Sequence, residues 1–169
     1  MERPNAFDFW GPKTLVGPEL KPGDVAPAFT LSKGRESVSN EQFAGKPLII
    51  SVIPSIDTGV CSKQTRRFNE EAAALGDAVN ILTVSADLPF ALGRWCGAEG
   101  IDKIVVASDH FDMSFGSAYG TYVKEVRIDS RAVFVVDANG IIQHAEYVPV
   151  GGQEPNYESA LAVVKRLLS

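Results

Sequence analysis

Cysteine and histidine are scarce in this chain, which has two of each among its 169 residues. Two cysteines can form only one intramolecular disulfide, so the core must hold without a disulfide framework, as a chain of this length can. Cys61 and Cys96 have the spacing of neither a zinc site nor a Cys-x-x-Cys motif. His110 and His144 show no joint metal-ligand spacing either. We therefore expect no metal site.

Long apolar runs and basic stretches are also missing. The longest apolar runs, at 48–54 and 132–136, are too short to span a bilayer, so we expect no membrane segment. The net charge is −5 and basic residues form only short groups such as Arg66–Arg67, which argues against nucleic-acid binding. No basic segment leads into an apolar one at the N-terminus, so we expect no secretory signal and a cytoplasmic location.

Strand and helix patterns alternate along the chain. Asp137–Gly140 is typical of a hairpin turn, and Asp87 is expected to cap a helix that has Pro89 in its first turn. The alternation predicts an α/β fold with a mixed central sheet covered by helices on both faces. We expect an N-terminal extension, 1–19, packed on one domain, 20–169. Strands are predicted at 25–31, 48–54, 79–85, 104–107, 132–136 and 141–148, and helices at 58–75, from 89, and at the C-terminus from about Tyr157.

Cys61 lies where a buried strand pattern ends and a helical pattern begins. Free N–H groups and the helix dipole favour an anion at such a position, and the thiolate is the reactive form of cysteine. A buried, inert cysteine is an equally good interpretation of position alone. The position therefore indicates thiol chemistry without establishing it.

The segment from Pro54 to Cys61 resembles the peroxiredoxin active-site motif Pro-x-x-x-Thr/Ser-x-x-Cys, with Thr58 at its centre. The resemblance extends from about Leu15 to the C-terminus, although Ala28 stands where the superfamily often has an aspartate. It is closest to the thiol peroxidase subfamily, the atypical two-cysteine peroxiredoxins. The segments that carry this closer resemblance are 85–91, 94–100, 131–137 and 157–161.

The resemblance implies a thioredoxin-like fold, a homodimer and the reduction of hydrogen peroxide and alkyl or lipid hydroperoxides. It makes Cys61 the cysteine that attacks the peroxide and Cys96 the one that then forms a disulfide with it, recycled by thioredoxin. Sulfur carries the electrons, so no bound cofactor is expected. The two cysteines are on different predicted helices, and a disulfide needs Cα atoms within about 7 Å. We expect one helix to unwind partly on oxidation, helped by Gly93 and Gly97 beside Cys96.

Three further residues receive catalytic roles from the resemblance. Thr58 would hydrogen-bond the peroxide, although a hydroxyl there could simply cap the helix. Pro54 would shield the site from water, although it could merely end the strand. Arg131 would stabilise the thiolate and the polarised O–O bond. From the residues alone Arg131 could equally be a solvated arginine at a strand end, because the chain has rival cations at Arg127, Arg66 and Arg67.

Substrate preference, assembly and biological role are less directly indicated. An apolar rim suited to alkyl hydroperoxides is predicted from Ile56, Val60, Leu88, Phe90 and Trp95, which could instead belong to the core. A partner surface is hinted at by Phe111, Phe115, Tyr119 and Tyr122. A peroxide sensor that passes its disulfide to a regulatory partner would use the same residues as an enzyme. A purely structural interpretation predicts two inert thiols.

Overall fold

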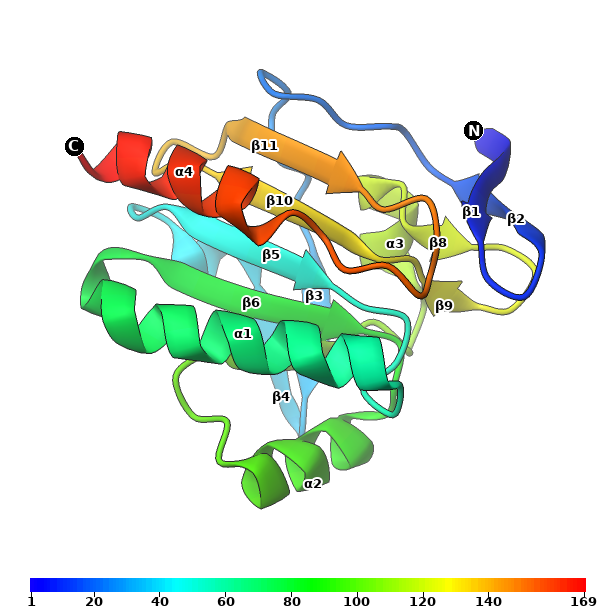
Figure 1. The fold of residues 1–169 in the computed structure, drawn as a ribbon, viewed down its shortest axis with the longest axis horizontal. Helices are drawn as coiled ribbons and strands as arrows, with labels where there is room; N and C mark the ends of the chain where they lie inside the picture. The colour runs from blue at the N-terminus through cyan, green and yellow to red at the C-terminus, as the bar shows by residue number, and fades with distance from the viewer.

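Seven strands form the central sheet of the computed structural model, which describes residues 1–169 (Figure 1). Their order is β11-β10-β5-β6-β7-β3-β4. The pairs β5–β6 and β6–β7 are parallel and all the others antiparallel, which confirms the predicted mixed sheet. The strands are β3 (Thr30–Lys33), β4 (Glu36–Ser39), β5 (Leu48–Val52), β6 (Asn80–Ser85), β7 (Val105–Ser108), β10 (Ala132–Val136) and β11 (Ile142–Tyr147).

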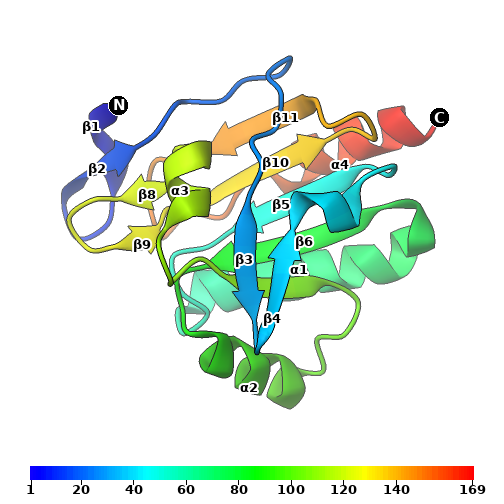
Figure 2. The same ribbon diagram turned by 180° about the vertical axis from the view of Figure 1, so that it is seen from behind.

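Helices cover both faces of this sheet, as expected. Every residue of β5 and β10 is buried, because side chains on both sides of these strands meet a covering layer. One layer contains α1 (Gly59–Leu75), α2 (Pro89–Glu99) and α4 (Tyr157–Leu168), whose apolar residues share a core cluster with Ile49 and Val133. The opposite layer contains α3 (Ser114–Tyr119), seen in front of the sheet in Figure 2.

The predicted cap of α2 is wrong. The N-cap residue is Leu88, with Pro89 at the first helical position, and no side chain caps the helix. The Asp87 carboxylate is engaged elsewhere: it accepts hydrogen bonds from the Ser55 hydroxyl at 2.8 Å and the Ile56 amide at 2.7 Å. Asp87 therefore ties the end of β6 to the loop that precedes α1.

The N-terminal residues form a hairpin of β1 (Glu2–Asp8) and β2 (Pro12–Val16). It belongs to a separate four-stranded sheet, completed by β8 (Tyr122–Val123) and β9 (Ile128–Asp129). Phe7, Leu15 and Val123 form a small core of their own there. The boundary at residues 19 and 20 stays a prediction.

Short 3₁₀ helices occur at η1 (Asn40–Phe43) and η2 (Gly76–Ala78). No helix has the length and apolarity needed to cross a membrane.

Two further expectations need correction. Residues 25–29 are not part of a strand, because β3 begins at Thr30 and Val25 makes only an isolated bridge to Ile141. Phe115 and Tyr119 cannot belong to an exposed partner surface, because both are fully buried. Their rings stack with centroids 4.3 Å apart in the core beneath the sheet.

Candidate active site

Cys61 lies in the first turn of α1, just beyond the end of β5, and is fully buried. Thr58 is the N-cap of this helix, and its hydroxyl oxygen accepts a hydrogen bond from the Cys61 amide at 3.2 Å. Pro54, between the strand and this cap, is also buried. The Pro54–Cys61 segment therefore turns the chain from strand to helix with the cysteine sulfur facing the interior.

The Arg131 guanidinium reaches this sulfur from the neighbouring strand. Arg131 immediately precedes β10, whose first residue, Ala132, pairs with Val52 at the end of β5. Its Nη2 donates to the Cys61 Sγ at 3.2 Å and to the Gly151 carbonyl at 2.6 Å. The sheet register thus brings together two residues 70 positions apart in the chain.

The buried Arg131 charge has no carboxylate partner. The side chain is 1% exposed, and none of the ion pairs in the protein includes it. Its hydrogen-bond acceptors are Cys61, Gly151 and Gln64. A buried cation is costly unless it is paired and hydrogen-bonded, so this guanidinium is placed to stabilise negative charge that develops at Cys61.

The rival cations are all engaged elsewhere. Arg127 donates to the His110 carbonyl at 2.6 Å. Arg66 pairs with Glu99 at 3.2 Å, and Arg67 pairs with carboxylates on α1 and α4. Of the arginines weighed from the sequence, only Arg131 therefore contacts the cysteine sulfur.

Gln64 is a residue of the site that the sequence analysis missed. Its Oε1 accepts from Arg131 Nη1 at 3.0 Å, and its Nε2 donates to the Ser51 hydroxyl at 2.8 Å. A signal was present, because residues three apart on a helix share a face and Gln64 follows Cys61 by one turn. Gly151 was also missed, and a backbone acceptor leaves no comparable signal in the sequence.

Cys96 lies on α2 and is half-buried; both cysteines are free thiols. It lines a pocket of about 490 Å³ that Cys61 does not line. Burial raises the pKa of the Cys96 thiol, and the positive charge of Lys33 on the same pocket opposes this only in part. Folded α2 therefore holds Cys96 as a neutral thiol, which packs against the same apolar cluster as Cys61 but lines a pocket that Cys61 does not.

The predicted apolar rim is only partly exposed. Leu88 and Phe90, at the start of α2, are 53% and 79% exposed. Ile56 belongs to the core, and the Arg66 guanidinium lies over the Trp95 ring at 5.7 Å. Of the residues predicted for the rim, Leu88 and Phe90 therefore expose the most apolar surface.

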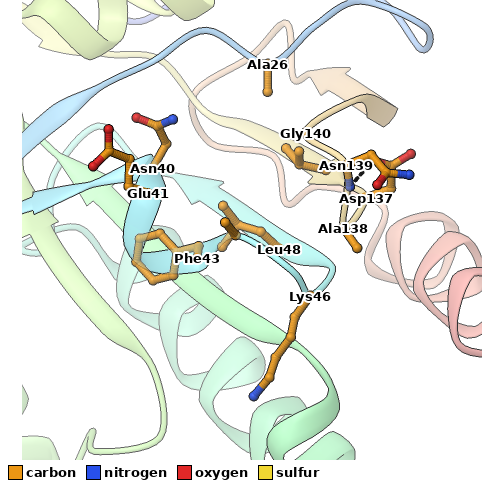
Figure 3. A pocket seen from close by; sticks show the side chains of 12 residues that line it. Ala26, Asn40, Glu41, Phe43, Lys46, Leu48, Asp137, Ala138, Asn139 and Gly140 are labelled. Carbon is orange, nitrogen blue, oxygen red and sulfur yellow. Dashed lines mark hydrogen bonds between the residues drawn. The ribbon is translucent and has the colours of Figure 1, made fainter.

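A further pocket, of about 250 Å³, lies at the other end of the sheet (Figure 3). Phe43 of η1, Leu48 at the start of β5 and the turn Asp137–Gly140 contribute to its lining. Because Cys61 follows the opposite end of β5, this pocket is remote from the thiol site.

Comparison with known proteins places the chain in a family. The sequence pattern of the Redoxin family matches residues 21–161. A thiol peroxidase of Bacillus subtilis (strain 168) is 60% identical over 159 residues, which cover 94% of this chain and 95% of the relative. A thiol peroxidase of Listeria innocua is 53% identical, with coverage of 92% and 94%.

Solved structures agree on the fold. A peroxiredoxin-like protein from Aquifex aeolicus superimposes with a TM-score of 0.86 at 37% identity, covering 93% of each chain. A thiol peroxidase from Chromobacterium violaceum gives a TM-score of 0.82 at 18% identity, covering 94% of each chain, which supports the fold alone. The predicted thioredoxin-like α/β fold is confirmed. The chain belongs to the thiol peroxidase subfamily of the peroxiredoxins and is a thiol-dependent peroxidase.

Proposed function

We propose that Cys61 is the peroxidatic cysteine and that the chain reduces hydrogen peroxide and alkyl or lipid hydroperoxides. The observation that supports this most directly is the contact of 3.2 Å between Arg131 Nη2 and Cys61 Sγ, made by a buried guanidinium that lacks a carboxylate partner. Such a cation suits a transition state in which negative charge moves from sulfur to oxygen.

In the first step the Cys61 thiolate attacks the distal peroxide oxygen. The S–O bond forms as the O–O bond breaks, and the departing oxygen takes up a proton to leave as water or an alcohol. Sulfur is oxidised to the sulfenic acid and the peroxide is reduced. Thr58 and Arg131 orient and polarise the peroxide, and Pro54 excludes water. Because Cys61 is fully buried, the loop from Pro54 to Thr58 must yield locally to admit a substrate.

In the second step Cys96 attacks the Cys61 sulfenic acid, giving the disulfide and one water. Helix α2 opens to allow this, because the folded helix holds Cys96 on a pocket that Cys61 does not line and burial keeps its thiol neutral. Leaving the helix removes the burial and permits ionisation. A dithiol reductant, thioredoxin, then takes over the disulfide and restores both thiols.

We infer that the enzyme is a cytoplasmic homodimer. Phe111 is 81% exposed and Val126 41% exposed. The segments that carry them are linked, because the Arg127 side chain donates to the Phe111 carbonyl at 3.4 Å. This apolar surface suits a contact with a second copy. Sedimentation of the wild-type chain and of Phe111→Glu tests the inference: a monomeric wild type, or an unchanged dimer in the variant, would contradict it.

The chemical proposal is tested with one equivalent of cumene hydroperoxide added to the reduced protein, followed by mass-spectrometric mapping of both thiols over time. We expect rapid loss of both thiols and a Cys61–Cys96 linkage. The matched controls are Cys61→Ser, which should leave Cys96 reduced, and Cys96→Ser, which should accumulate oxidised Cys61. Two free thiols in the wild type would refute the peroxidase roles, and oxidation of Cys61 without the internal bond would favour a peroxide sensor.

A further inference from the structure

The carbonyl of Gly151 is the main anchor of the Arg131 guanidinium. It accepts from Arg131 Nη2 at 2.6 Å and from Nε at 3.2 Å, so one backbone oxygen fixes one edge of the planar group. Gly151 is buried in the segment between β11 and α4. Where this carbonyl lies therefore determines where Nη2 meets the Cys61 sulfur.

The N-terminal hairpin holds this segment in place. The Asp8 amide donates to the Pro149 carbonyl at 2.8 Å, and the Gly151 amide donates to the Asp8 carbonyl at 2.9 Å. These bonds form a parallel bridge between Asp8, at the end of β1, and Val150. Gly151 thus has its N–H bound to the hairpin and its C=O bound to Arg131.

Phe9, the next residue of the hairpin, covers Gly151. A Cβ at Gly151 would lie 2.6 Å from Phe9 Cδ1 and 3.3 Å from Phe7 Cζ, so the glycine permits a close approach that no other residue could make without movement. Phe9 itself stacks on Phe7, with ring centroids 5.8 Å apart. The Phe7 side chain packs in the small core that also contains Leu15 and Val123.

We propose that the N-terminal hairpin is part of the machinery that orients Arg131, with Phe9 and Gly151 as positioning residues for the oxidation of Cys61. The chain of contacts runs from the hairpin through Gly151 to the guanidinium and then to the sulfur. This inference rests on the proposed roles of Cys61 and Arg131. Residues 1–19 would then affect the rate of catalysis indirectly, because the contacts described link the hairpin to the sulfur only through Gly151 and Arg131.

Two variants disturb the contact between the hairpin and Gly151, one on each side of it. Phe9→Ala removes the ring that covers Gly151, whereas Gly151→Ala keeps the hairpin and forces the segment away from it. The matched control is Pro4→Ala, because Pro4 lies in the same hairpin, is exposed and is not among the nearest neighbours of the Gly151 Cβ position, whereas Trp10 packs on Phe9 with ring centroids 4.4 Å apart. Phe9→Tyr is the conservative rescue, since it retains the ring.

The measurement is the single-turnover rate of Cys61 oxidation by hydrogen peroxide in a Cys96→Ser background, recorded against pH, with thermal unfolding of every variant. We expect Phe9→Ala and Gly151→Ala to slow oxidation about tenfold and to change its pH profile, because a displaced guanidinium stabilises negative charge at the reacting atoms less well. Pro4→Ala and Phe9→Tyr should match the parent protein.

A purely structural hairpin would lower the unfolding temperature without changing the rate or its pH profile. That result in a folded Phe9→Ala or Gly151→Ala protein overturns the inference, and Gly151→Ala decides the matter if Phe9→Ala does not fold. Failure of the parent protein to form a sulfenic acid at Cys61 would instead refute the proposed function, and this inference with it. The two failures are therefore distinguishable.

Discussion

Replacing Arg131 by methionine removes a buried positive charge while retaining a long apolar side chain. At the observed separation of 3.2 Å, a guanidinium and a thiolate attract each other by about 5 kcal/mol at an effective dielectric constant of about 20. Part of this attraction already stabilises the reactant thiolate and does not affect the barrier. Loss of one preorganised donor to developing charge costs about 3 kcal/mol, so we expect the oxidation rate to fall roughly 150-fold.

The assay is stopped-flow oxidation of Cys61 in the Cys96→Ser background at several peroxide concentrations. Arg127→Met is the matched control, because Arg127 is exposed and bonds the His110 carbonyl instead of the sulfur. Circular dichroism establishes that both variants are folded. A folded Arg131→Met protein that oxidises within threefold of its parent would refute the electrostatic argument.

Three further variants test other parts of the structure. Asp129→Asn should stabilise the fold more at pH 8 than at pH 4. Burial and then the charge of nearby Asp109 raise the pKa of Asp129, so the stability contributed by its protonated form is fully present below the ordinary pKa of 3.8 and is lost as the pH rises through the raised pKa. Equal urea-unfolding shifts at both pH values would contradict this. Thr58→Val should cost about 1 kcal/mol of stability through the lost cap and should also slow peroxide reduction. Thr58→Ser keeps the hydroxyl and should therefore retain both the stability and the rate of the wild type. A Thr58→Ser protein of normal stability that still reduces peroxide slowly would show that the hydroxyl is not what sets the rate. Oxidation of the wild type should lower its helical circular-dichroism signal, and Cys96→Ser should abolish that loss. Persistence of the loss in Cys96→Ser would place the rearrangement in the response to Cys61 oxidation itself.

Features that depend on residues close together in the chain could be predicted from the sequence. The strand from Leu48, the helix from Gly59 and the position of Cys61 in the first turn of that helix follow from apolar patterning and the Pro54–Cys61 motif, all local features. The hairpin at Asp137–Gly140 was equally local, and its strands pair as predicted. The prediction for Asp87 was wrong because a carboxylate before a helix caps that helix only when no other donor binds it. Here the Ser55 hydroxyl and the Ile56 amide, in the loop before α1, donate to the Asp87 carboxylate instead.

What only the tertiary structure decided are the contacts between distant segments. Sequence could not choose Arg131 over its rivals on physical grounds, because the choice depends on the register between β5 and β10. The role of Gly151 as an acceptor was beyond its reach, since every residue carries the same carbonyl and only packing selects one. The N-terminal hairpin likewise has no local signature of its link to Cys61. The sequence by itself determined the strand, the turn and the helix start that hold Cys61, and the three-dimensional fold decided which groups surround its sulfur, because burial and hydrogen bonding across the chain are properties of the assembled structure.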